Sequence, residues 1–116
     1  MTRLFDEHDV CLEAAEGELA VSGDVDFDVA APLAAAGAKW IADQPVTDAL
    51  QFDLRGVDRV SSAALSVMLE WLRSAQRAGI EVAGVQLSPA LAKLTALAGL
   101  DSLLPQADVH RVAAAD

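Results

Sequence analysis

The sequence lacks the features of a membrane-inserted or disulfide-bonded protein. Its single cysteine, Cys11, excludes a disulfide within the chain and is typical of a reducing compartment. No apolar run reaches the ~18–20 residues that a membrane-spanning helix requires. The acidic residues 1–9 also lack the apolar run of a signal peptide. We therefore expect a cytoplasmic protein with no direct membrane insertion.

Residue patterns that carry catalysis are also missing. The chain has no Walker-type phosphate loop, and no Gly-x-Ser-x-Gly elbow surrounds Ser61 and Ser62. The two histidines, His8 and His110, lie near opposite ends of the chain, and no Cys/His cluster has the spacing of metal ligands. We therefore expect no enzymatic activity, no cofactor and no metal site.

Basic residues are scarce. The chain has 8 lysines and arginines against 18 acidic residues, a formal net charge of −10. Such a charge repels nucleic-acid phosphates and anionic lipid headgroups, so we expect neither as a direct partner. Two interpretations stay open: the charge serves solubility, or it attracts a basic surface of a partner protein.

What the chain does have is a hydrophobic fraction of 53% in 116 residues, enough for the core of one domain. Apolar periodicity and turn residues predict strands alternating with helices. We expect strands over 10–13, 18–22, 46–54 and 80–87, helices over about 26–42, 62–78 and 89–98, and a short edge strand at 109–112. This order predicts an α/β domain whose mixed sheet has four to five strands, with three to four helices and a hairpin at one side.

Residues 49–78 organise this prediction. Leu50, Phe52 and Leu54 alternate with polar neighbours, as in a half-buried strand. Ser61 or Ser62 can cap the next helix, because a hydroxyl accepts from the free N–H groups of the first turn. Residues spaced by three or four predict the buried side of that helix, namely Leu65, Met68, Leu69 and Leu72. Val67 and Trp71 fall off that side, and Trp71 is either covered by a neighbouring element or exposed as an interface anchor.

The central motifs and the order of elements together resemble the STAS domain family. The matching residues are Phe52-Asp53-Leu54-Arg55-Gly56-Val57, followed by Val60-Ser61-Ser62-Ala63-Ala64-Leu65. The family pattern is a hydrophobic strand with Asp-Leu-x-x-Val, then Asp-Ser/Thr-Ser/Ala-Gly-Leu at a helix start. The resemblance covers about 10–105 and implies one STAS domain over 1–116. Separately, we expect residues 113–116 to be frayed, because they end the chain. The family includes bacterial anti-sigma-factor antagonists and the STAS subunit of the Mla phospholipid-trafficking ABC transporter.

Departures from the family pattern separate these two branches. Ser61 stands where the family usually has aspartate, and Ala64 stands where it usually has glycine. Ser62 aligns with a hydroxyl position that is threonine in the transporter subunits. Ala63 aligns with the serine that partner kinases phosphorylate in the antagonists, so the usual phosphoacceptor is missing and only Ser61 or Ser62 remains for that role. The resemblance is thus closer to the transporter subunit.

The resemblance implies a non-enzymatic regulatory and assembly subunit. It would bind the ATPase subunit of an Mla-type transporter, which serves outer-membrane lipid asymmetry, and so lie peripherally at the inner membrane. The alternative is an anti-sigma-factor antagonist that binds a kinase-type anti-sigma factor. No residues of the chain support an enzyme or a nucleotide-binding domain. We expect a docking face centred on Ser62, whose members are Ser61, Ser62, Ser66, Glu70, Trp71, Arg73 and Arg77.

Overall fold

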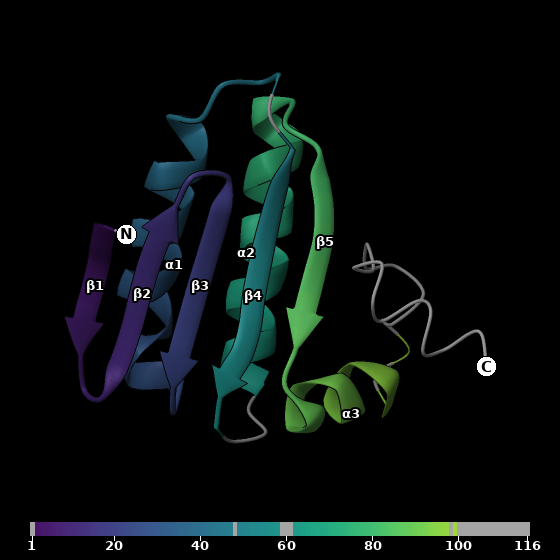
Figure 1. Ribbon diagram of the computed structural model, residues 1–116. Helices are drawn as coiled ribbons and strands as arrows, with labels where there is room; N and C mark the ends of the chain where they lie inside the picture. Colours follow the sequence, from purple (N-terminus) through teal and green to yellow (C-terminus); the bar gives the residue numbers. More distant parts are fainter. Residues whose placement is uncertain (1, 48, 59–61, 98, 100–116) are drawn as a thin grey trace.

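A five-stranded sheet and three helices make up the described part of the chain (Figure 1). The computed structural model describes residues 2–47, 49–58, 62–97 and 99. The strands are β1 (Thr2–Glu7), β2 (Val10–Ala15), β3 (Glu18–Gly23), β4 (Leu50–Val57) and β5 (Val82–Leu87). The helices are α1 (Phe27–Ala42), α2 (Ser62–Ala78) and α3 (Pro89–Leu97).

The sheet is mixed, with the strands in the order β1-β2-β3-β4-β5. The pairs β1–β2 and β2–β3 are antiparallel, whereas β3–β4 and β4–β5 are parallel. This architecture confirms the predicted α/β fold with a hairpin on one side and helical crossovers on the other. The carboxyl ends of β3, β4 and β5 therefore meet at one end of the sheet, where α1, α2 and α3 begin (lower end in Figure 1).

Strand β1 was not predicted from the sequence. It carries only two partly buried apolar residues, Leu4 and Phe5, so it shows little periodicity. Its turn into β2 contains neither glycine nor proline, because His8 and Asp9 themselves adopt positive φ values of 54° and 65°. The strand thus lacked both signals on which a sequence-based prediction depends.

Two other strand predictions began too early. Strand β4 starts at Leu50 and not at residue 46, and Val46 is 63% exposed. Strand β5 starts at Val82, while the predicted start, Ile80, is a buried residue that precedes the strand. The predicted strand at 109–112 lies outside the described residues.

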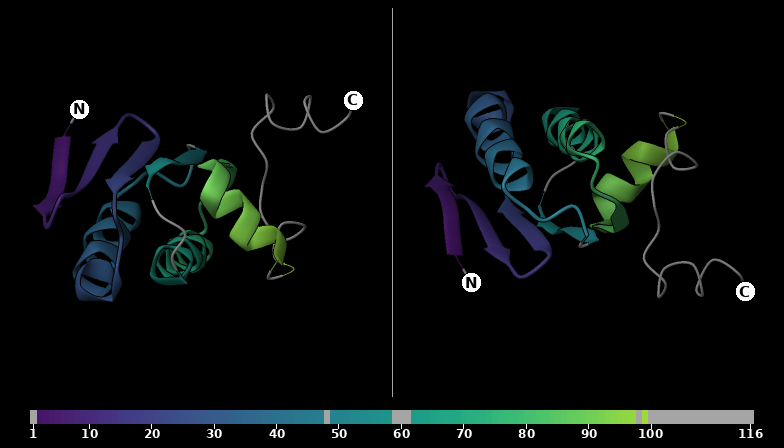
Figure 2. Two further views of the ribbon diagram at one scale, coloured as in Figure 1. Left: turned by 90° about the horizontal axis from the view of Figure 1, so that it is seen from below. Right: turned by 90° about the horizontal axis from the view of Figure 1, so that it is seen from above.

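Helices α1 and α2 pack against the same face of the sheet (Figure 2). Helix α1 is capped by Asp26, whose carboxylate accepts from the backbone N–H groups of Asp28 at 2.9 Å and Val29 at 3.3 Å. Alternate residues of the strands meet these helices in one core. Its largest fully buried side chains include Leu12, Leu19, Leu33, Phe52, Leu54, Met68 and Trp71.

The predicted buried side of α2 was partly wrong. Met68 is fully buried, but Leu65, Leu69 and Leu72 are only partly buried. The helix instead buries a broad side that faces both α1 and the sheet, and alanine is common there because small side chains allow close approach. Its members are Ala63, Ala64, Val67, Met68, Trp71, Ser74 and Ala75. The leucines therefore flank the interface and do not form its centre.

Candidate docking surface

A polar stripe runs along the side of α2 that faces away from the core. Ser62, Ser66 and Arg73 are exposed. Glu70 and Arg77 lie on the same side, with side-chain exposures of 35% and 63%. Successive members are three or four positions apart, so they line up along one side of the helix. The structure brings together five of the seven residues that we assigned to docking.

Trp71 does not belong to this stripe, and its placement on an exposed face was wrong. The side chain is 0% exposed. Its indole Nε1 donates to the carbonyl oxygen of Ala34 at 3.1 Å, and its ring meets that of Phe52 edge-on at 6.0 Å between centroids. Gly37 provides the space on α1, because a Cβ there would overlap the indole ring. Trp71 is therefore a core residue that joins α2 to α1 and to the sheet.

The start of α2 presents one hydroxyl and hides the neighbouring position. Ser62 is the first helical residue and is exposed, whereas Ala63 is 0% exposed. Ala63, which the resemblance aligns with the phosphorylated serine of anti-sigma-factor antagonists, is thus both apolar and buried. Ser61, the remaining predicted member of the docking face, lies outside the described residues.

Glu70 holds the two arginines of the stripe together. Its Oε1 accepts from Nη2 of Arg73 at 3.2 Å, and its Oε2 accepts from Nη2 of Arg77 at 3.1 Å. These hydrogen bonds, first that from Arg77 and then that from Arg73, hold the pKa of Glu70 below its usual value. The stripe therefore stays charged at neutral pH, with one carboxylate shared between two guanidinium groups.

Phe27 is a residue that sequence reasoning missed. It is the first residue of α1 and is 71% exposed. Helices α1 and α2 start at the same end of the sheet, so this exposed aromatic ring belongs to the same end of the molecule as Ser62 (Figure 1). The available sequence signal was its position directly after the Asp26 cap, outside the buried series Val29, Leu33, Gly37 and Ile41.

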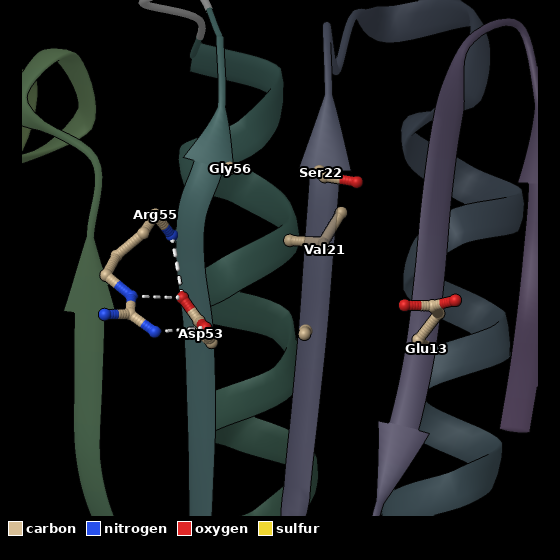
Figure 3. A pocket seen from close by; sticks show the side chains of 7 residues that line it. Glu13, Val21, Ser22, Asp53, Arg55 and Gly56 are labelled. Atoms are coloured by element: carbon tan, nitrogen blue, oxygen red, sulfur yellow. Dashed lines mark hydrogen bonds and ion pairs between the residues drawn. The ribbon is translucent and has the colours of Figure 1, made fainter. Parts of the chain in front are cut away.

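The opposite face of the sheet carries a shallow hollow of about 470 Å³ (Figure 3). Its main polar feature is the pair of Asp53 and Arg55. The Asp53 carboxylate accepts from the Arg55 backbone N–H at 3.0 Å, from its Nε at 3.0 Å and from its Nη2 at 2.9 Å. These bonds lower the pKa of Asp53. Both carboxylate oxygens are engaged, so the pair fixes the local structure and offers no free base.

The described residues contain no group of three or more His, Cys, Asp or Glu side chains able to hold a metal ion. Within the same part of the chain, no helix is long and apolar enough to cross a bilayer. The exposed features described above are a polar side of α2 and, at the start of α1, an aromatic ring that is 71% exposed.

A mixed five-stranded sheet with helices that begin at its carboxyl end is the fold of a STAS domain, a class of protein-interaction domain. The family described as "Mlab, STAS domain" matches residues 8–105, so the chain belongs to this MlaB-type STAS family. Among solved structures, an anti-sigma factor antagonist from Mycobacterium paratuberculosis is similar, with 27% sequence identity and a TM-score of 0.66. That match covers 85% of this chain and 84% of the other. No curated protein matches the chain.

Proposed function

We propose that this chain is a non-enzymatic docking subunit of an Mla-type phospholipid-trafficking ABC transporter. It binds the transporter's ATPase subunit through the exposed side of α2 and supports assembly and ATP hydrolysis there. This contact holds it at the cytoplasmic side of the inner membrane. The observation that carries the proposal is the start of α2, where an exposed Ser62 precedes a buried Ala63 within a domain of the MlaB-type family.

The docking surface that we propose has two parts at the same end of the sheet. The polar part is Ser62 and Ser66 on the first turns of α2. The apolar part is Phe27, whose aromatic ring is the kind of side chain that contributes most to binding when a partner buries it. Small hydroxyl side chains on α2 allow the partner to approach the helix closely, and Phe27 supplies apolar area at the same end of the sheet.

The alternative function is anti-sigma-factor antagonism, which the similarity to the mycobacterial antagonist favours. Partner switching through phosphorylation needs an accessible hydroxyl, and this chain has a buried alanine at the matching position. Incubation with a kinase-type anti-sigma factor and ATP distinguishes the two functions. Incorporation of phosphate at Ser61 or Ser62 would favour the antagonist.

The proposal is tested by co-purification with the ATPase encoded nearest to this gene. Ser62→Arg places a long charged side chain at the start of α2, and we expect it to abolish co-purification by steric clash. Ser22→Arg is the matched control, because it introduces the same side chain at an exposed position on β3. Circular dichroism checks that both variants are folded.

Three outcomes distinguish docking through α2, docking elsewhere on the domain and no binding to the ATPase. Loss of the ATPase with Ser62→Arg, but not with Ser22→Arg, supports docking through α2. A folded Ser62→Arg protein that still co-purifies fully places the interface elsewhere on the domain. A wild-type chain that never binds the ATPase contradicts the transporter function itself.

A further inference from the structure

The C-terminal half of α2 has a charge opposite in sign to that of the whole chain. The 17 residues of α2 include three charged side chains, Glu70, Arg73 and Arg77. Two positive groups and one negative group leave a net charge of +1 on this helix, in a chain whose formal net charge is −10. A surface that differs in sign from the rest of its protein selects a partner surface by charge.

The two guanidinium groups keep donors free for such a partner. Glu70 binds Nη2 of Arg73 and Nη2 of Arg77, and the latter also lies 3.4 Å from Oγ of Ser74. A guanidinium group has five N–H donors, so most have no acceptor among the described residues. The arginine side chains are 60% and 63% exposed. Glu70 thus positions two cationic groups side by side without neutralising both.

A groove between α1 and α2 lies next to Arg77. Its volume is about 280 Å³, and its lining residues are Ala38, Ala42, Ser74, Arg77 and Ala78. Apart from Arg77, the lining side chains are small, so the backbone of a partner segment can approach the two helices. The groove is at the far end of α2 from Ser62, about 22 Å along an axis that rises ~1.5 Å per residue. It is therefore distinct from the contact around Ser62.

We propose that this groove binds an acidic segment of the partner protein, whose Asp or Glu carboxylates pair with Arg73 and Arg77. The inference rests on the proposed function, since the partner is the ATPase subunit. Arginine pairs with carboxylates through two parallel hydrogen bonds, which gives both strength and orientation. Glu70 is a positioning residue that holds the two guanidinium groups together. The net negative charge of the chain repels an acidic segment, whereas the two arginines attract it to this region.

The test measures the dissociation constant and the association rate of the ATPase subunit at low and high salt. We expect Arg77→Glu to weaken binding by about tenfold or more, through a direct repulsion of the carboxylates. Lys39→Glu is the matched control: it makes the same change of charge at an exposed residue of α1 that lines a different hollow, beside Arg3 and Leu4. We also expect wild-type binding to weaken as salt rises.

Glu70→Gln tests the sign of the partner's charge. Removal of the carboxylate that pairs with both arginines should accelerate association with an acidic segment, whereas a basic segment would associate more slowly. Equal affinities of Arg77→Glu and Lys39→Glu would overturn the acidic-segment inference while leaving docking at Ser62 intact. Slower association of Glu70→Gln would do the same. If the wild-type chain does not bind the ATPase at all, both proposals fail.

Discussion

Trp71 lies directly over Gly37, and this contact joins the two helices of the domain. The indole ring occupies the volume that any side chain at position 37 would need, while its Nε1 donates to Ala34 at 3.1 Å. Glycine costs roughly 1 kcal/mol relative to alanine inside a helix. Here the glycine permits a fully buried tryptophan, the largest side chain of the core.

Gly37→Ala should therefore destabilise the protein although alanine is the better helix former. Overlap with the indole ring should lower the free energy of unfolding by about 1–2 kcal/mol net of the propensity gain. Urea denaturation of the single variant and of Gly37→Ala combined with Trp71→Leu measures this. The second substitution removes the overlapping ring, so Gly37→Ala should cost less in that background. An equal cost in both backgrounds would mean that Trp71 does not fill this space.

The orientation of α2 predicts unequal effects of two apolar truncations. Met68 is fully buried, so Met68→Ala should lower the free energy of unfolding by about 2–5 kcal/mol. Leu72 is only partly buried, so Leu72→Ala should cost clearly less. Thermal or chemical denaturation of the two variants compares them directly. A larger loss for Leu72→Ala would restore the orientation that the leucine spacing suggested.

Phe27→Ala should weaken binding to the ATPase and leave stability nearly unchanged. A side chain that is 71% exposed contributes little to the core, but an aromatic residue that is a binding hot spot contributes ~2 kcal/mol or more. Calorimetry gives the binding loss, and the melting temperature is the control. Leu97→Ala, at another exposed apolar residue, on α3, is the matched substitution. Indistinguishable binding by the two variants would exclude Phe27 from the interface.

The ion pair of Asp53 and Arg55 predicts a dependence of stability on pH. Hydrogen bonds from Arg55 lower the pKa of Asp53 in the folded protein relative to the unfolded chain. The stabilisation is therefore present above the unfolded pKa, near ~4, and is lost as the pH falls through the lower folded pKa. Arg55→Gln should flatten this acid limb in denaturation curves between about pH 2 and pH 5. If the stability of wild type and that of Arg55→Gln fall identically with pH in this range, the ion pair does not contribute to the pH dependence.

The sequence predicted the fold because most elements carry strong local signals. Phe52 and Leu54 alternate with polar residues, Asp26 caps α1, and Gly79, with φ of 74°, follows the end of α2. The order of strands and helices then leaves few topologies for the sheet. The polar stripe on α2 was also visible, since spacing alone places Ser62, Ser66 and Arg73 on one side.

Sequence-based prediction failed where close packing, and not hydrophobicity, determines which residues of α2 are buried. Leucine spacing pointed to one side of α2, yet the helix turns its alanines and Trp71 inward, because small residues let it contact α1 closely. A hydrophobicity pattern ranks Leu72 above Ala75 and so cannot find this interface. Phe27 was missed for a related reason: its exposure depends on where the neighbouring elements end.

Strand β1 has a consequence for solubility. It lies at the edge of the sheet, precedes the family-matched residues 8–105, and carries Arg3, Asp6 and Glu7 as well as an irregular register between Arg3 and Phe5. Charges and irregular pairing at an edge discourage a second chain from extending the sheet. Removal of residues 1–8 would make β2, with the sequence Val-Cys-Leu-Glu-Ala-Ala, the new edge. Such a trimmed protein would uncover the part of α1 that β1 contacts, and it would expose a regular, largely apolar strand to aggregation.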